Sequence, residues 1–161
     1  MKLIIMRHGE AEEAAASRND FDRALTKKGR KRVRSVGRTL RGDLQIPELI
    51  IASPLVRALQ TAEIVAAELD PNEPVVVRQE IAPDGDPMLL LRELVLSDIE
   101  CAMLVGHEPA LSDMVRVLLP HEWTKNLTKA MVVALRVDRD ASAKLLWVLD
   151  PRRLELAPSR A

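Results

Sequence analysis

The segment LIIMRHGE, residues 3–10, begins with a short apolar run and ends in polar residues. The run, residues 3–6, lacks the polar alternation of a strand with one solvated face, so it predicts a strand covered on both faces, as in parallel sheets. Two other runs have the same character, LIIA at 49–52 and AMLV at 102–105. A helix signal follows each run. The sequence therefore predicts three buried strands whose polar exits share one edge of a sheet.

Helix signals fill the segments between these runs. Thr26 is expected to cap a basic helix that extends to about Arg41. Ser53 is expected to cap a helix over residues 54–69, with Pro54 at its first position, where the missing N–H is tolerated. A further helix over residues 110–119 is ended by proline. The expected buried stripe of the basic helix is Val33, Val36, Gly37 and Leu40.

The remaining segments complete an α/β pattern. The polar tail from Pro151 predicts no structure beyond a short surface segment. The alternation of strands and helices predicts a three-layer α/β/α sandwich with a mostly parallel central sheet, in a single domain spanning residues 1–161. The other predicted elements are strands at 75–77, 131–137 and 144–149, a helix at 87–96 opened by Asp86, and a turn at 138–142.

Composition narrows the class of protein. The chain is 47% hydrophobic and 30% charged, which favours a globular protein, and no apolar run reaches the roughly 18 residues of a membrane span. The apolar start is too short for a secretion signal, so we expect a cytoplasmic protein. Net charge is zero and the chain has no tyrosine and one phenylalanine. Neither a nucleic acid nor a membrane is therefore expected as a partner.

Two arginines and two histidines follow the buried strands. Arg7 and His8 leave the first run, Arg57 follows the second, and His107 follows the third. In open α/β sheets, ligands bind beyond the carboxyl ends of the strands. Arginines there predict a site for a phosphoryl group, and a neutral imidazole beside them can attack phosphorus. The second histidine can donate to the phosphoryl oxygens as charge shifts in the transition state.

No cofactor and no metal is expected at this site. The three histidines, His8, His107 and His121, are far apart in the sequence, and neither an H-E-x-x-H pattern nor paired cysteines occur. Transfer of a phosphoryl group to an imidazole requires no metal in this interpretation.

The segment Arg7-His8-Gly9-Glu10 resembles the RHG signature of the histidine phosphatase superfamily, also called phosphoglycerate mutase-like. Later blocks match the family in the right order, namely Leu25-Thr26 with Gly29, SPLVRALQTA at 53–62 and VGHEP at 105–109. Within the family the chain looks most like the SixA-type phosphohistidine phosphatases. The resemblance implies a phosphoglycerate mutase-like fold, phosphorylation of His8, binding of the phosphoryl group by Arg7 and Arg57, and a pocket completed by His107.

The resemblance implies roles for two further residues. Arg23 matches an arginine of the SixA-type pattern, which implies contact with phosphate or substrate, although Ala24 replaces the usual proline. Glu80 begins the block EIAPDGD at 80–86, in the region from which larger family members supply a proton donor. Asp84 and Asp86 lie in the same loop, so this assignment stays open.

The lengths of the loops favour a protein substrate. Fifteen residues separate Gly9 from Leu25, and the 80–86 segment is brief, so the site should be shallow and open, without the lid of larger relatives. We therefore expect a monomeric enzyme that removes phosphate from a phosphorylated histidine of another protein. A phosphatase for small phosphomonoesters and a phosphoprotein-binding module without turnover are the alternatives. The basic segment at 27–41 is either a contact surface for an acidic partner or a solvated helix face.

Overall fold

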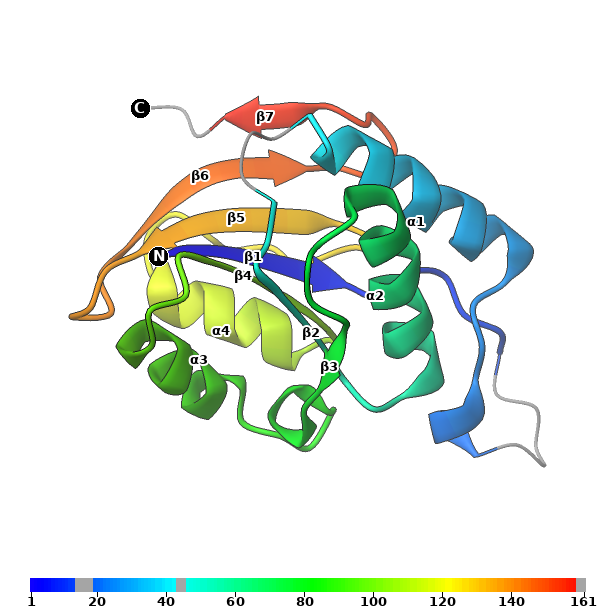
Figure 1. Cartoon of the computed structure of the whole chain (residues 1–161), viewed down its shortest axis with the longest axis horizontal. Coiled ribbons are helices and arrows are strands. Elements are labelled where there is room, and N and C mark those ends of the chain that lie inside the picture. The colour runs from blue at the N-terminus through cyan, green and yellow to red at the C-terminus, as the bar shows by residue number, and fades with distance from the viewer. Residues whose placement is uncertain (14–18, 43–45, 159–161) are drawn as a thin grey trace.

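A seven-stranded sheet runs through the part of the chain that the structure describes. The structure is a computed structural model that describes residues 1–13, 19–42 and 46–158. The strand order is β3-β2-β4-β1-β5-β6-β7 (Figure 1). The strands are β1 (Lys2–Arg7), β2 (Leu49–Ala52), β3 (Val76–Val77), β4 (Cys101–Gly106), β5 (Val132–Val137), β6 (Ala143–Leu149) and β7 (Leu156–Pro158).

The sheet has a parallel half and an antiparallel half. Strands β3, β2, β4 and β1 pair in parallel, whereas β5, β6 and β7 are added to β1 in antiparallel order. Strand β6 consequently points the same way as the parallel group. The six strands expected from the sequence are confirmed to within about one residue at each end.

Strand β7 was not expected from the sequence. Residues 156–158 pair with β6 at the outer edge of the sheet. Pro158 is compatible with this position because an edge strand leaves one row of N–H groups unused. Its three residues carry no alternation, so the pairing partner, rather than local propensity, decides the structure.

In the described residues, four α-helices cover the two faces of the sheet, and this confirms the expected three layers (Figure 1). Helices α1 and α2 pack on one face, and α3 and α4 on the other. The connections, as far as the structure describes them, contain two short 3₁₀ helices. The helices are α1 (Lys27–Leu40), α2 (Val56–Leu69), α3 (Pro87–Leu96), α4 (Ala110–Leu118), η1 (Asp20–Asp22) and η2 (Gln79–Ile81).

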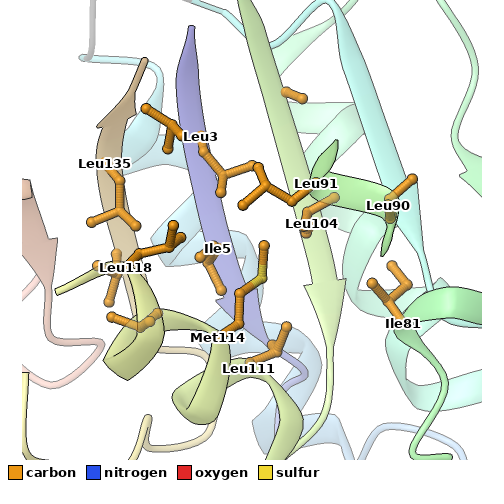
Figure 2. Close-up of a cluster of buried hydrophobic side chains, with 14 of the residues drawn as sticks. Leu3, Ile5, Ile81, Leu90, Leu91, Leu104, Leu111, Met114, Leu118 and Leu135 are labelled. Atoms are coloured by element: carbon orange, nitrogen blue, oxygen red, sulfur yellow. The ribbon is translucent and has the colours of Figure 1, made fainter. Parts of the chain in front are cut away.

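The apolar run of β1 supplies both layers of the core. Leu3 and Ile5 point to the face covered by α3 and α4, where Figure 2 shows Ile5 beside Met114 and Leu118 of α4. Ile4 and Met6 belong to the opposite cluster, under α1 and α2. This two-sided burial is the reason why the run has no polar alternation.

Helix α1 follows its sequence signals closely. The Thr26 side chain accepts a hydrogen bond from the Gly29 amide at 2.9 Å, which caps the helix as expected. The expected stripe is buried, and Gly29 is buried with it. A Cβ at Gly29 would lie 2.1 Å from the backbone oxygen of Glu10. Only glycine therefore lets the first turn of α1 approach the RHGE segment this closely.

The start of α2 corrects one expectation. The helix begins at Val56, its N-cap is Leu55 without a side-chain hydrogen bond, and Pro54 precedes the helix. The Ser53 hydroxyl accepts the Leu55 amide at 3.3 Å and contacts His107, so it serves the turn and the site rather than the helix. The expected end is confirmed, because Asp70 takes a left-handed conformation, with φ of 56°, directly after Leu69.

Across residues 1–13, 19–42 and 46–158, none of the helices combines the length and the apolar character required to cross a bilayer. Within those same ranges, His, Cys, Asp and Glu side chains form no group of three that could hold a metal ion.

Candidate active site

The parallel strand pairing brings the three polar exits together. Arg7 lies opposite Gly106 in the register of β1 and β4, and the His8 amide donates to the Gly106 carbonyl at 3.0 Å. On the other side of β4, the Ser53 amide donates to the Val105 carbonyl at 3.0 Å. The residues that follow three separate strands therefore share one sheet edge, as the sequence predicts.

The two predicted site histidines are neighbours. The ring centroids of His8 and His107 are 5.1 Å apart, with planes tilted by 51°. Their exposed fractions are 7% and 3%, so both rings are almost withdrawn from solvent. Burial lowers the pKa of His8 to about 4 and that of His107 to about 3, and the charges of the nearby arginines act in the same direction. Both rings are therefore neutral near pH 7.

A backbone contact fixes the tautomer of His8. Its Nδ1 atom lies 2.7 Å from the Gly9 carbonyl oxygen, which can only accept a hydrogen bond. Nδ1 therefore carries the proton, and Nε2 retains a lone pair. A neutral imidazole with a free Nε2 is the state that can attack phosphorus.

His107 is oriented by Ser53. Its Nε2 atom is 2.8 Å from the Ser53 hydroxyl, which already accepts the Leu55 amide. Ser53 is fully buried, and in the described residues the His107 ring is the acceptor within reach of its hydroxyl proton, so we infer that the hydroxyl donates to Nε2 and that the ring proton sits on Nδ1. That Nδ1 atom is buried and has no hydrogen-bond partner among the described residues. It is a donor available to an anion in the site.

Arg57 comes from the first turn of α2 and is 6% exposed. Its Nη1 donates to the Asp20 backbone oxygen at 2.7 Å, and its Nη2 contacts the Asp20 carboxylate at 2.9 Å. The same carboxylate receives Arg23 Nη1 at 2.8 Å. These contacts hold the pKa of Asp20 below its usual value, with the hydrogen bond from Arg23 as the largest cause. The Asp20 carboxylate thus lies between Arg57, which was expected to bind the phosphoryl group, and Arg23, which was expected to contact phosphate or substrate.

Thr61 ties α2 to the segment after β1. Its hydroxyl donates to the Arg57 carbonyl at 2.6 Å and accepts the Gly9 amide at 3.0 Å. Thr61 is fully buried. It therefore fixes the first turn of α2 relative to the backbone beside His8.

The Arg7 side chain is held by the segment that precedes β5. Its Nη1 donates to the Leu127 carbonyl at 2.8 Å. The Leu127 amide in turn donates to Ser112, whose hydroxyl donates to the Glu108 carboxylate. The Nε atom of Arg7 is buried without a partner in the part of the chain that the structure describes. Like His107, Arg7 therefore keeps a donor available for an oxyanion.

Within the described residues, the Glu80 carboxylate forms no hydrogen bond with His8, His107, Arg7 or Arg57. Its carboxylate forms a two-point contact with Arg78, at 2.6 and 3.1 Å, and Arg78 also pairs with Glu93. The hydrogen bonds from Arg78 lower the pKa of Glu80, which disfavours the protonated form that a proton donor requires. Arg23, by contrast, is joined to Arg57 through Asp20.

Comparisons with known proteins agree with this geometry. A family model described as the histidine phosphatase superfamily (branch 1) matches residues 3–82. Phosphohistidine phosphatase SixA of Escherichia coli (strain K12) is 30% identical over 160 residues, which cover 98% of each chain. The chain belongs to the histidine phosphatase superfamily. A phosphohistidine phosphatase SixA homolog of Haemophilus influenzae is also 30% identical, over 94% of this chain and 97% of the relative.

The fold of this histidine phosphatase agrees with the same relationship. A solved structure of the protein histidine phosphatase SixA complexed with tungstate has a TM-score of 0.88 to this chain. The two are 29% identical, and the match covers 96% of this chain and 100% of the other.

Sequence reasoning missed two residues of this histidine phosphatase site. Asp20 had no signal, because an acidic residue three positions before Arg23 has no predicted partner until α2 is packed beside η1. Thr61 lies inside the quoted block at 53–62 but has no chemical signature of its own. Its position one helical turn after Arg57, on the buried face, is the pattern that could have identified it.

Proposed function

We propose that this chain is a phosphohistidine phosphatase that forms a covalent phospho-His8 intermediate without a metal. The observation that carries the proposal is the pairing of His8 and His107, each neutral and each oriented by a defined hydrogen bond. Arg7 and Arg57 provide the positive charge that a phosphoryl group requires. The SixA relatives support the same activity. The structure of SixA in complex with tungstate also supports it, because tungstate is an oxyanion that resembles phosphate.

The first step transfers the phosphoryl group between two imidazoles. The Nε2 lone pair of His8 forms a new bond to phosphorus while the bond to the substrate ring breaks, and its electron pair stays on that ring nitrogen. A substrate ring protonated on its other nitrogen leaves as neutral imidazole, so no enzyme acid is required. Arg7, Arg57 and the Nδ1–H of His107 donate to the equatorial oxygens.

The second step returns His8 to its starting state. Water attacks phosphorus, the P–N bond electrons return to Nε2, and one water proton passes to an oxygen of the released phosphate. The Gly9 carbonyl stabilises the positive charge that the ring carries while it is phosphorylated, because Nδ1 keeps its proton at 2.7 Å from that oxygen.

A comparative assay tests this function. Purified protein is assayed with a histidine-phosphorylated protein and with small phosphomonoesters, each with and without a chelator. We expect a much higher kcat/KM for the phosphohistidine substrate, unchanged by the chelator. Preference for a small ester would instead support the alternative phosphatase, and stoichiometric binding without release of phosphate would support the binding module.

The role of Glu80 is tested by Glu80→Gln. Because Arg78 holds the carboxylate ionised and takes up its oxygens, we expect turnover of phosphohistidine to change by less than about twofold. Hydrolysis of small phosphomonoesters is measured in parallel, since an alkoxide leaving group needs an acid. A loss of tenfold or more on phosphohistidine would assign Glu80 to the reaction and contradict this arrangement.

Asp20 is expected to compete with the phosphoryl group for Arg57. In Asp20→Asn the side-chain charge disappears, but the Asp20 backbone oxygen still receives Arg57 Nη1. Removing a like charge beside a bound dianion should strengthen tungstate inhibition by about three- to tenfold. Inhibition constants of the variant and of a surface control, Asp113→Asn, provide the measurement. Weaker inhibition in Asp20→Asn would show that Asp20 helps to position Arg57 for the ligand.

The pKa values predict that the site histidines resist protonation. In the folded protein His8 should titrate near pH 4 and His107 near pH 3, against an ordinary value of 6.5. His8 therefore stays unprotonated, and able to attack, throughout mildly acidic conditions. NMR titration of the imidazole resonances, assigned with single histidine variants, checks this. A midpoint near 6.5 for either ring would mean that the ring is not buried in solution.

We also propose a cytoplasmic location, a monomeric state and a single domain over residues 1–161. These properties suit an enzyme with an open site for a phosphorylated partner.

A further inference from the structure

A charged groove adjoins the candidate active site. Its volume is about 370 Å³, and it lies between the segment after β1, the first turns of α1, the segment before β5 and the turn before β7. The lining includes five cationic side chains and one acidic side chain, namely Arg7, Lys28, Arg32, Lys129, Arg152 and Glu10.

The positive charge of the groove is only partly balanced. Lys28 lies 3.3 Å from the Glu10 carboxylate, and Arg152 pairs with Asp150. Arg32 donates to the backbone oxygen of Pro151. Lys129 has no ion pair within the described ranges. Five cations against two carboxylates leave an excess of positive charge in a recess, where a low-dielectric wall strengthens its field.

Arg7 connects the groove to the reacting residue. It precedes His8 directly and lines the groove, while its buried Nε remains available to an oxyanion. The charge of Lys129, on another wall of the groove, contributes to the lowered pKa of His8. A substrate whose phosphoryl group lies at His8 would therefore place its neighbouring residues at the groove.

The structure separates the basic side chains of residues 27–41 into two groups. The sequence had left this segment either as a contact surface for an acidic partner or as a solvated helix face. Lys28 and Arg32 line the groove. Arg34 and Arg38 instead pair with Glu68 of α2, as an ordinary solvated helix surface. Only part of the basic helix is thus available to an acidic partner near the site.

We propose that this groove binds an acidic side chain that flanks the phosphohistidine in the protein substrate. The inference rests on the proposed function and specifies its substrate further. The exposed Lys28 and Arg152 at the rim can reach a carboxylate on another protein, and Arg7 serves both the carboxylate and the phosphoryl group. Selectivity arises because an acidic flank gains attraction that a neutral flank lacks.

The test uses two peptides with the same phosphohistidine, flanked by glutamates in one and by glutamines in the other. We expect the wild-type protein to show about fivefold higher kcat/KM for the acidic peptide, with a preference that falls as salt rises. Lys129→Glu and Arg152→Glu should each reduce this ratio by about two- to fivefold. The matched control is Lys31→Glu, an exposed lysine of α1 outside the groove, which should keep the wild-type ratio.

Fluorescence anisotropy of the unphosphorylated peptides measures their affinity for the groove in the absence of turnover. Tighter binding of the acidic peptide, lost in Lys129→Glu, supports the groove. Equal binding and equal kcat/KM for both peptides overturn it, and the phosphohistidine activity then stands on its own because both peptides are hydrolysed. Failure to hydrolyse either peptide overturns the proposed function. An equal effect of Lys31→Glu would show that general surface charge, not the groove, sets the preference.

Discussion

His8→Ala is expected to abolish turnover of phosphohistidine, with a loss of about 10⁴-fold or more in kcat. The physical reason is that the variant has no Nε2 lone pair to accept the phosphoryl group, so the double displacement cannot begin. Arg7, Arg57 and His107 remain, and binding of tungstate should therefore persist. Steady-state release of phosphate and tungstate binding by calorimetry measure the two effects separately.

The matched control is His121→Ala. His121 is the third histidine of the chain and lies exposed after α4, apart from the site. We expect it to keep the wild-type rate. Because His8 is buried, circular dichroism and thermal unfolding should accompany the assay, and His8→Asn provides a second variant that retains polarity. Substantial turnover by a folded His8 variant would show that the phosphoryl group goes directly to water.

Arg57→Ala is expected to lower kcat/KM by about 10²–10³-fold. The side chain is almost buried in the first turn of α2, and its charge acts on the His8 ring. Its removal takes away two donors to the phosphoryl oxygens and also leaves the Asp20 carboxylate with Arg23 as its remaining ion-pair partner, so more of its negative charge acts on the ligand. Both effects weaken binding of the transferring group, so tungstate affinity should fall together with the rate.

Arg57→Lys separates charge from geometry. It keeps the positive charge but loses the planar pair of donors, so its rate should lie between those of the wild type and Arg57→Ala. The surface control is Arg38→Ala, which removes an exposed arginine of α1 that pairs with Glu68. A rate for Arg57→Ala within tenfold of that of Arg38→Ala would exclude Arg57 from the phosphoryl site.

The parallel half of the sheet was predictable because its strands are buried on both faces. Runs such as residues 49–52 have no alternative to a covered strand, and Thr26 and Asp86 mark helix starts through side-chain caps that the structure contains. Ser53 was expected to cap a helix on the same kind of local signal, but it does not cap α2. Its hydroxyl is taken by the Leu55 amide and by His107, and only the pairing of β2 with β4 brings that histidine within reach.

Long-range contacts also explain what the sequence could not assign at the site. Arg7, His8, Arg57 and His107 were found because they follow strands and match ordered family blocks. Asp20 acquires its role only when η1 packs beside α2, which joins residues 37 positions apart. Glu80 matches a family block, yet Arg78, two residues away, turns its carboxylate into an ion-pair partner. Motif position predicts where a side chain lies, whereas its neighbours decide its protonation state.

Rapid quenching with a histidine-phosphorylated substrate tests the covalent mechanism most directly. The reaction is stopped within one turnover by alkaline denaturation, which preserves P–N bonds, and the modified residue is located by mass spectrometry. We expect a transient phosphoryl group on His8, absent from His8→Ala and from unreacted protein. Full-rate turnover without any label on His8, or a label found on His107 instead, would contradict the mechanism.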